Sequence, residues 1–379
     1  MKIEYKFGIT DEHRRSLLRT LNSSRDFIEG EQLSHFEDDL RKYFKVDHAV
    51  CVSSGTAALH LANLAIGLHA GDEVITPSNS FNSSADSIAL TGARPKFIDI
   101  EKDTFNLDPN LLGQAYTQRS KAVMPVHFGG HPAQMDDISD FARKKSLWIV
   151  EDAAQSFGAR FRKRITGTIG DIGIISFVHH KHVTVFCDGG AVLTNDASLA
   201  RKVRLLSNHG RGNAFYKRDR LGIPKHENEA IGLNYRMGEL AASLGRVSLR
   251  LWIQGKTGIE VRQRMAKYYS LRLAAEHNLK LPQEKDSVKH SYLRYLIIAK
   301  SRDRLYCHLV RNGVDVKIHY RYPIHLLRPY MERFGYRKGM FPITEWYSSH
   351  TLSLPMCPPG YTSSELDYVT NKIADFYDK

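Results

Sequence analysis

One lysine, Lys181, stands among three histidines in a polar loop between two short apolar segments, 174–178 and 191–194. Both segments are rich in β-branched residues, which predicts strands. The sequence Asp-Gly-Gly at 188–190 predicts a tight turn back into the sheet, because glycine tolerates positive φ. A lysine held between two strands could bind a carbonyl compound covalently. A solvated surface lysine is the simpler interpretation, since lysine side chains are usually exposed.

Two features upstream favour the covalent role. The apolar segment 147–150 is followed closely by Asp152, so a carboxylate is expected at the end of a strand. The sequence Ser-Ser-Gly-Thr-Ala-Ala at 53–58 ends a strand and opens a helix, an arrangement that directs backbone N–H groups and a helix dipole at a phosphate. A lysine for an imine, an aspartate for a pyridine nitrogen and a helix N-terminus for a phosphate together predict a pyridoxal-phosphate pocket.

Further short motifs extend this pattern along the chain. They are Phe36-Glu37, Glu151-Asp152-Ala153-Ala154-Gln155, Ser176-Phe177, Asn208-His209-Gly210, Gly232-Leu233-Asn234-Tyr235-Arg236 and Leu352-Ser353-Leu354-Pro355. In order and spacing, the chain from about Phe27 to Tyr377 resembles the sugar aminotransferases of the fold-type-I pyridoxal-phosphate enzymes, often called the DegT/StrS group. The resemblance implies an α/β protein of aspartate-aminotransferase-like fold type I. Its large domain would carry a mainly parallel mixed sheet, beside a small C-terminal α+β domain.

The resemblance also implies roles for the residues of the cofactor pocket. Asp152 would keep the pyridine nitrogen protonated, because a nearby carboxylate favours the cationic form of a base. Gln155 would contact the ring hydroxyl, and Phe81 would stack on the ring. Helix capping is the alternative role for the aspartate, and ordinary core packing is the alternative for the phenylalanine.

Phosphate binding is expected from the N–H groups of Gly55, Thr56 and Ala57 together with the Ser176 hydroxyl. A helix cap with no ligand is the alternative for that turn. The resemblance adds Asn234, which would reach the phosphate from the neighbouring subunit. The active site would then be shared, and the protein would be a homodimer.

The position of the cofactor lysine depends on the register of its loop. Counting four residues from Phe177 gives Lys181, and seven residues separate Lys181 from Asp188, which matches one of two loop lengths associated with the transferases. The other length, six residues, would point to His182. A sister group has histidine at this position and catalyses sugar 3-dehydration, so the register decides the reaction. We favour Lys181 as the residue that binds the cofactor and moves the proton, and we expect the histidines to be solvated or hydrogen-bonded loop residues.

Substrate contacts are expected from the polar loop 208–232, because a loop of this length in a compact domain is usually functional or mobile. Its arginines suit phosphate recognition. Tyr235 and Arg236 follow it directly. Three more candidates lie in a segment that the resemblance places near the substrate: His319, Tyr320 and His325.

Strands and helices alternate from residue 49 to residue 150, which predicts a mainly parallel sheet with helices on both faces. Ligands of such sheets bind at the carboxyl ends of the strands. Asp11 is expected to cap an N-terminal helix, and 314–319 is expected to be a strand of a β-α-β unit. The expected organisation is an N-terminal arm over 1–30, a large cofactor-binding domain over 31–250 and a small domain over 251–379.

The composition restricts the remaining classes of function. The 379 residues include 42% hydrophobic residues, no long apolar run and no signal-peptide pattern, so a soluble cytoplasmic protein without membrane contact is expected. The four scattered cysteines, Cys51, Cys187, Cys307 and Cys357, suit reduced thiols and show no metal-binding spacing. The net charge of +13 raises the question of nucleic acid, but the basic residues are spread out without an RNA-binding motif, so we expect none.

Together these observations predict a pyridoxal-phosphate aminotransferase, with the pyridoxamine form as its intermediate. The amino group would pass from L-glutamate to the C3 or C4 keto group of a nucleotide-linked keto-deoxy sugar, as in the biosynthesis of lipopolysaccharide or antibiotic sugars. Within the same fold the alternatives are a sugar 3-dehydratase, or a transferase acting on a keto sugar phosphate or keto-cyclitol. A non-catalytic regulator is the alternative from another class.

Overall fold

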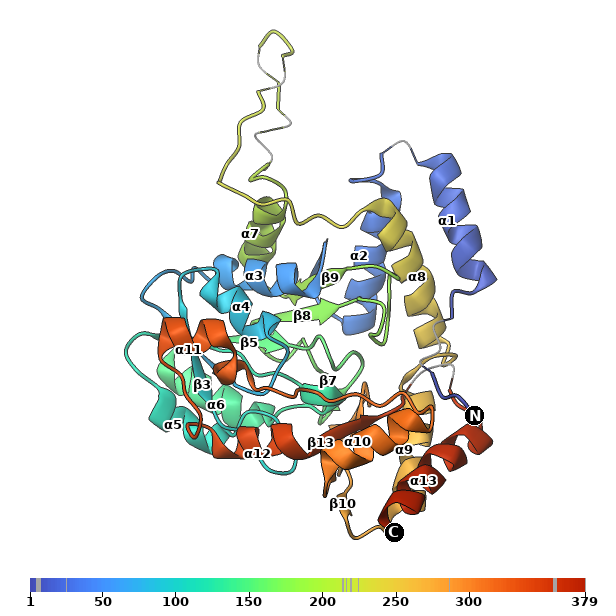
Figure 1. Ribbon diagram of the computed structural model, residues 1–379. Helices are drawn as coiled ribbons and strands as arrows, with labels where there is room; N and C mark the ends of the chain where they lie inside the picture. Colours follow the sequence, from blue (N-terminus) through green and yellow to red (C-terminus); the bar gives the residue numbers. More distant parts are fainter. Residues whose placement is uncertain are drawn as a thin grey trace.

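The computed structural model describes residues 1–4, 8–24, 26–212, 215, 217–218, 220–223, 225–285, 287–356 and 360–378. Cys357 and five positions of the 208–232 loop, at 213, 214, 216, 219 and 224, lie outside the described residues. A seven-stranded sheet forms the centre of the molecule, in the order β1-β9-β8-β5-β4-β2-β3 (Figure 1). No helix among the described ranges is long and apolar enough to span a membrane.

The sheet is mixed but mainly parallel, as predicted. Neighbouring strands are parallel from β3 to β8, and β9 runs antiparallel to both β8 and β1. The carboxyl ends of the other six strands therefore lie along one edge of the sheet. Its strands are β1 (His48–Val52), β2 (Glu73–Pro77), β3 (Arg94–Ile98), β4 (Ser120–Val123), β5 (Trp148–Asp152), β8 (Ile172–Ser176) and β9 (Gly190–Thr194).

Helices cover both faces of this sheet, because successive strand residues point to opposite sides. Ile174 and Val192 belong to the core under α3 and α7, whereas Ile175 and Leu193 belong to the core under α2 and α8. The flanking helices are α2 (Glu31–Phe44), α3 (Gly55–Ala65), α4 (Ser83–Ala89), α5 (Leu112–Ala115), α6 (Met135–Lys145), α7 (Ala197–Ser207) and α8 (Glu239–Ile253).

The C-terminal part has its own sheet and core. The three-stranded sheet has the order β10-β12-β13 and is antiparallel throughout. The strand expected at 314–319 is wrong: Val314 and Lys317 form only isolated bridges, because the segment divides its backbone bonds between Ile3 and the free edge of β13 at Ser353. The elements are α9 (Ile259–Leu273), β10 (Leu279–Lys280), β12 (Tyr295–Ala299), α10 (Arg302–Arg311), β13 (Thr351–Leu354) and α13 (Ser363–Tyr377).

Several C-terminal segments pack against the large sheet and its helices. The short strand β11 (Val288–Lys289) pairs with β6 (Arg160–Phe161), which pairs with β7 (Arg164–Ile165). The helix α11 (Arg328–Phe334) packs in a core that includes Ala85 and Phe97, and α12 (Pro342–His350) packs in a core that includes Ile100 and Phe128. Short 3-10 turns occur at Pro109–Leu111, Phe128–Gly130 and Ile324–Leu326. The domain boundaries at residues 30 and 250 stay predictions.

The N-terminal helix α1 (Asp11–Ser23) lies along α8 (Figure 1). The expected cap at Asp11 is wrong: Thr10 is the N-cap, since its hydroxyl accepts from the N–H of His13, and Asp11 instead begins the first turn. The segment 234–236 lies beside β1, at the end of the sheet that is farthest from β3. Of the residues between α7 and α8, the described ones include an extension that projects from the body (Figure 1).

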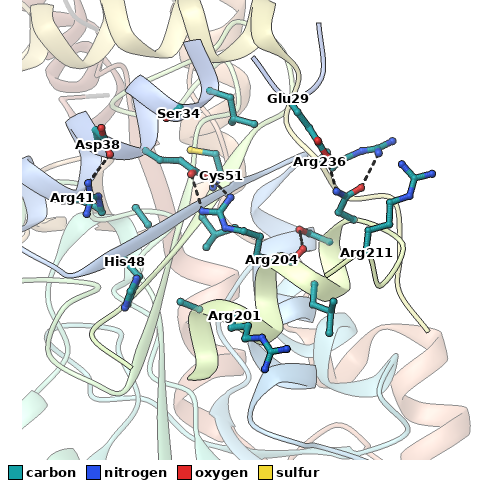
Figure 2. Close-up of a pocket in the computed structure, with 18 of the residues that line it drawn as sticks. Glu29, Ser34, Asp38, Arg41, His48, Cys51, Arg201, Arg204, Arg211 and Arg236 are labelled. Atoms are coloured by element: carbon teal, nitrogen blue, oxygen red, sulfur yellow. Dashed lines mark hydrogen bonds and ion pairs between the residues drawn. The ribbon is translucent and has the colours of Figure 1, made fainter. Parts of the chain in front are cut away.

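A cavity of about 770 Å³ lies beside β1, between α2 and α7 (Figure 2). Arginines and carboxylates of its lining are already paired: Arg204 with Glu37 at 2.8 Å, and Arg41 with Asp38 at 2.6 Å. Neither Lys181 nor Asp152 lines it. This cavity is therefore separate from the residues that the sequence assigns to the chemistry.

Candidate active site

Three of the predicted residues lie at the same edge of the central sheet. Ser54 follows β1, Asp152 ends β5 and Ser176 ends β8, and these strands all point the same way. Lys181 follows Ser176 in the connection to β9. Residues that are far apart in the sequence are thus brought to one place by parallel strand order, as expected for this class of sheet.

The phosphate end of the predicted pocket is the N-terminus of α3. Ser54 caps the helix and its hydroxyl accepts from the N–H of Ala57 at 3.0 Å, so Gly55 and Thr56 are the first-turn residues whose N–H groups are better placed for a ligand. The Thr56 hydroxyl contacts Ser83 Oγ at 2.7 Å. A side chain at Gly55 would place its Cβ 2.8 Å from Ser176 Cβ. The helix start and the Ser176 hydroxyl therefore form a narrow polar cradle that suits a phosphate.

Asp152 is buried and its carboxylate is held on both oxygens. One oxygen accepts from Ser84 Oγ at 2.6 Å, and the other accepts from the N–H of Ala154 at 3.2 Å. The second bond closes a local turn, and no helix begins among the described residues between β5 and β6, so the helix cap foreseen as the alternative for this residue is not present. A carboxylate fixed in this way suits a partner that carries a proton on nitrogen.

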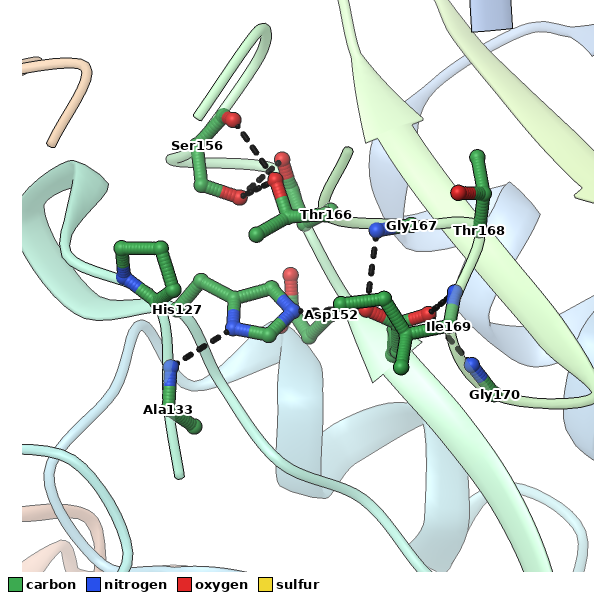
Figure 3. A network of polar contacts seen from close by, with 12 residues as sticks. His127, Ala133, Asp152, Ser156, Thr166, Gly167, Thr168, Ile169 and Gly170 are labelled. Atoms are coloured by element: carbon green, nitrogen blue, oxygen red, sulfur yellow. Dashed lines mark hydrogen bonds and ion pairs between the residues drawn. The ribbon is translucent and has the colours of Figure 1, made fainter. Parts of the chain in front are cut away.

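A second buried network supports the end of β5 (Figure 3). The Ala133 N–H donates to His127 Nδ1 at 3.0 Å, so His127 carries its proton on Nε2 and donates to Glu151 at 2.9 Å. Burial would raise the pKa of Glu151, but the bonds from His127 and from the N–H groups of Gly170 and Gly167 lower it below its ordinary value. The backbone N–H of His127 also donates to the backbone carbonyl of Asp152 at 3.1 Å. This network fixes the backbone that presents Asp152.

Lys181 is in an environment that disfavours its charged form. Burial first, and then the positive charge of Arg294, lower the pKa of the Lys181 amine from 10.5 to about 7, while Asp152 acts in the opposite direction. A large fraction of the amine is then neutral near neutral pH. A neutral amine is the nucleophilic form, so Lys181 suits covalent attachment to an aldehyde.

The neighbouring histidines are directed elsewhere. His182 is buried, donates from Nε2 to the Ser291 carbonyl at 3.2 Å and packs its ring edge against Trp252. His180 has its pKa lowered to about 3, by burial and then by Lys181 and Arg294, so it is neutral. His179 is exposed and contacts the His180 ring. Among the residues of this loop, Lys181 is therefore the better candidate for the cofactor.

The ring wall of the predicted pocket combines Phe81 with Tyr320 of the C-terminal part. Phe81 is 54% exposed, so ordinary core packing does not describe it. Its ring lies 6.0 Å from that of Tyr320, which also contacts Phe128. Gln155 accepts from the Gly129 N–H through Oε1 at 3.1 Å, which orients its amide and leaves the NH₂ group as a donor. These positions suit a flat aromatic cofactor with a ring hydroxyl.

Arg294 was not among the predicted site residues. Its backbone N–H donates at 3.1 Å to the carbonyl of Gly129, the same residue whose N–H donates to Gln155, and its guanidinium contacts His319 and the Tyr320 hydroxyl. His319 is held in turn by Ser353 at 2.7 Å, and burial followed by Arg294 lowers the pKa of its ring well below 6.5. The signal available in the sequence was a charged residue within the otherwise apolar segment 292–299.

The other predicted substrate residues do not all meet Lys181. His325 is fully buried, where it joins Ser78 Oγ at 2.6 Å to Glu345 at 3.1 Å. Tyr235 and Arg236 lie beside β1, where the Tyr235 hydroxyl contacts His60 at 3.3 Å and Arg236 borders the cavity of Figure 2. Asn234 is exposed next to them, opposite Asn208. Their predicted roles remain predictions.

The fold and the residues at the strand ends define a pyridoxal-phosphate-dependent aminotransferase. The polar cradle at α3, the buried Asp152 and the amine of Lys181 fit the three functional groups of this cofactor. The chain belongs to the DegT/DnrJ/EryC1/StrS aminotransferase family, because the family model matches residues 9–374. The resemblance noted in the sequence is thereby confirmed.

Several known proteins are similar to this chain over most of its length. A "Pleiotropic regulatory protein" of Geobacillus stearothermophilus is 35% identical over 370 residues, 97% of this chain and 94% of the relative. The dTDP-3-amino-3,4,6-trideoxy-alpha-D-glucose transaminase of Streptomyces venezuelae is 35% identical over 343 residues, 90% of this chain and 86% of the relative. The crystal structure of S. venezuelae DesV with a ketimine intermediate shares 33% identity with a TM-score of 0.90, covering 97% of this chain and 95% of that one.

Proposed function

We propose that this aminotransferase moves an amino group from L-glutamate to the C3 or C4 keto group of a nucleotide-linked keto-deoxy sugar. The observation that carries the proposal is the placement of a lysine with a strongly lowered pKa within the electrostatic reach of the buried Asp152. Similarity to a transaminase named for a dTDP-linked amino sugar supports the substrate class. We place the reaction in the cytoplasm, where nucleotide sugars are made.

The residues of the pocket divide the work. Lys181 attaches the cofactor and then, once released, carries the proton to and from the carbon that bears the amino group. Asp152 holds a proton on the pyridine nitrogen, and Gly55, Thr56 and Ser176 bind the phosphate. Pyridoxal phosphate, when bound, supplies the electron sink that makes this proton mobile. Phe81 and Gln155 orient the ring.

Arg294 is assigned to a carboxylate of the amino donor. The donor amine must reach the position of the Lys181 amine, so its α-carboxylate lies close to the same point. Arg294 acts electrostatically on Lys181, and its planar fork can bind a carboxylate through two bonds. Its attachment to the Gly129 carbonyl fixes the base of the side chain beside Gln155.

A homodimer with shared active sites is part of the proposal. Asn234 is exposed at the edge of the large sheet, where it is available to a second copy. Ile231, 98% exposed, and Leu221, 83% exposed, lie on the projecting segment between α7 and α8. Apolar side chains so exposed on a surface extension are typical of contacts with another chain.

The test is a transfer assay with L-glutamate carrying a heavy-nitrogen label and a dTDP-linked 4-keto-6-deoxyglucose as the acceptor. We expect labelled amino sugar and 2-oxoglutarate in equal amounts, and neither product with Lys181→Ala. Loss of the 3-hydroxyl without incorporation of the label would support the dehydratase instead. Transfer to a keto sugar phosphate or a keto-cyclitol but not to the nucleotide sugar would contradict the proposed substrate class.

A further inference from the structure

The N-terminal helix α1 reaches the Lys181 loop through a chain of hydrogen bonds. The helix packs along α8, and the buried side of α1 carries a polar residue, His13, which is only 2% exposed. A buried polar ring requires hydrogen-bond partners on both nitrogens. The identity of those partners shows what the helix is attached to.

The direction of each bond in this chain is determined by its donors. The Thr10 N–H donates to His13 Nδ1 at 3.2 Å, so this nitrogen is an acceptor and the ring proton is on Nε2. His13 Nε2 then donates to Ser248 Oγ on α8 at 3.1 Å. The Ser248 hydroxyl donates in turn to the carbonyl of Thr184 at 2.6 Å. This series of hydrogen bonds therefore ends at Thr184, three residues after Lys181.

A second contact joins the same helix to the same loop. The edge of the His13 ring meets the Phe186 ring, with centroids 4.9 Å apart. Phe186 adopts a left-handed backbone conformation with φ of 61°, and its N–H donates to Thr184 Oγ1 at 2.9 Å. Thr184 and Phe186 are therefore held both to each other and to α1 and α8.

The opposite side of the loop is held separately. The Val185 N–H donates to the Phe177 carbonyl at 3.0 Å, and His182 is bound to Ser291 of the C-terminal part. Lys181 lies between the Phe177 end and these anchors. The position of its amine depends on all of them, because the loop has no regular secondary structure between β8 and β9.

We infer that His13 and Ser248 are positioning residues, through which α1 holds the Lys181 loop in the conformation that captures and retains the cofactor. The inference rests on Lys181 as the cofactor lysine, as in the proposed function. It goes beyond that function because it assigns a role in the active site to an N-terminal helix that contributes no side chain to the pocket.

A matched pair of variants separates positioning from simple stabilisation. Ser248→Ala removes the hydroxyl that links His13 to Thr184. Ser16→Ala removes another hydroxyl of the α1–α8 contact, whose bond to the Ser243 carbonyl at 3.4 Å does not reach the loop. Both changes replace serine by alanine between the same two helices. Only Ser248→Ala should loosen the Lys181 loop.

The measurements are amide hydrogen exchange of the peptide spanning 178–189 and the rate of pyridoxal-phosphate loss after dilution of the loaded protein. For Ser248→Ala we expect both rates to rise by roughly tenfold or more, because the hydroxyl's hydrogen bonds to His13 and to the Thr184 carbonyl are both lost. His13→Ala should also raise both rates. The double variant should raise them no further than the stronger single variant, because both residues belong to one series of hydrogen bonds. Ser16→Ala should change neither rate by as much as about twofold.

The inference is overturned if Ser248→Ala and Ser16→Ala give the same exchange in 178–189, or if exchange rises without faster cofactor loss. Neither measurement uses a sugar or an amino donor. Failure of the proposed transfer reaction therefore leaves this comparison unchanged, and the two failures are distinguishable.

Discussion

Lys181 and Arg294 show how two neighbouring cations can serve one reaction. Burial and the field of Arg294 keep about half of the lysine amine neutral near pH 7, while the guanidinium keeps its positive charge. Lysine is suited to changing its protonation state, and arginine is not. The pair therefore suits the proposed division, in which Lys181 supplies the nucleophile and Arg294 binds the carboxylate of the donor.

Replacing Arg294 by glutamine should have two effects, because the residue both lowers the Lys181 pKa and, as proposed, binds the donor. In the wild type, the rate of cofactor attachment should rise with pH through about pH 7, the pKa of Lys181. In Arg294→Gln the midpoint should move to higher pH. The KM for glutamate should rise about tenfold or more, the usual loss for a charged hydrogen bond. Stopped-flow absorbance measures both.

Arg294→Lys is the control for charge without the planar fork. Arg294→Lys should keep the wild-type pH midpoint of cofactor attachment, but its KM for glutamate should rise. If Arg294→Gln leaves the midpoint and the KM unchanged, neither role of Arg294 holds.

For single residues, the sequence could predict site positions where the chemistry follows a motif. Lys181 and Asp152 could be proposed because each follows a strand signal, and Gln155 because the motif 151–155 resembles that of the family. Arg294 could not, since its function depends on the Gly129 carbonyl and on His319, which come from distant parts of the chain. His325 was proposed because its segment resembles one that lies near the substrate in the family, yet both nitrogens of its ring bond to Ser78 and Glu345.

Among the elements, the start of α3 fits closely against the sheet. The helix begins so close to β8 and β9 that glycine is required twice: a Cβ at Gly55 would lie 2.8 Å from Ser176 Cβ, and a Cβ at Gly190 would lie 2.4 Å from the Ser54 carbonyl oxygen. The predicted phosphate cradle therefore depends on the absence of side chains. The geometry of the cradle depends on how α3, β8 and β9 pack together.

Gly55→Ala should weaken pyridoxal-phosphate binding by about tenfold or more, because Ser176 or the helix start must move. Fluorescence titration of the cofactor-free protein measures the dissociation constant. Gly113→Ala is the matched control, since a Cβ there meets nothing within 4 Å, and it should leave binding unchanged. Equal dissociation constants for the two variants would show that the cradle does not hold the phosphate.

The alternation of strands and helices from β1 to β5 could be predicted, because continuous apolar runs and amphipathic helices leave clear patterns. The short strands β6, β7 and β11 could not, since two residues carry no periodicity. Segment 314–319 has the composition of a strand but makes only bridges, because strand formation depends on an available partner. Similarly, Thr10 rather than Asp11 became the cap of α1 through a reciprocal bond with His13.

For the molecule as a whole, the junction between the central sheet and the C-terminal part is notable for its buried histidines. His131 and His290 are in ring contact, and the Ser291 carbonyl accepts from His182. Burial lowers the pKa of His131 to about 4, and burial followed by nearby cations or histidines lowers the pKa values of His182 and His290 well below 6.5. These rings are held neutral in the folded protein.

Stability should therefore fall on acidification. The unfolded chain takes up protons on these histidines below about pH 6.5, whereas the folded chain does not, so the stability present above pH 6.5 is lost as the pH falls toward 4. Each such histidine contributes up to about 1.4 kcal/mol per pH unit. Thermal midpoints between pH 7.5 and pH 5 measure the slope, which should be shallower in His131→Gln. A flat profile would contradict the buried neutral state.

The proposed shared active site makes a prediction for mixed dimers. Lys181→Ala and Asn234→Ala should each be inactive or weakly active alone. After subunit exchange, mixed dimers contain one site with both residues intact, so about a quarter of the wild-type activity should return. The transfer assay on a mixture, before and after exchange, is the measurement. No recovery, with mixed dimers confirmed by native mass spectrometry, would place Asn234 in the site of its own chain.

The most direct test of this account is to locate the covalent bond between protein and cofactor. The protein is incubated with pyridoxal phosphate, reduced with borohydride and digested, and the modified peptide is sequenced by mass spectrometry. We expect one adduct, on Lys181, with none in Lys181→Ala and an unchanged adduct in His182→Ala. No reducible adduct, or one on a different lysine, would contradict the assignment of Lys181 on which the proposed aminotransferase chemistry depends.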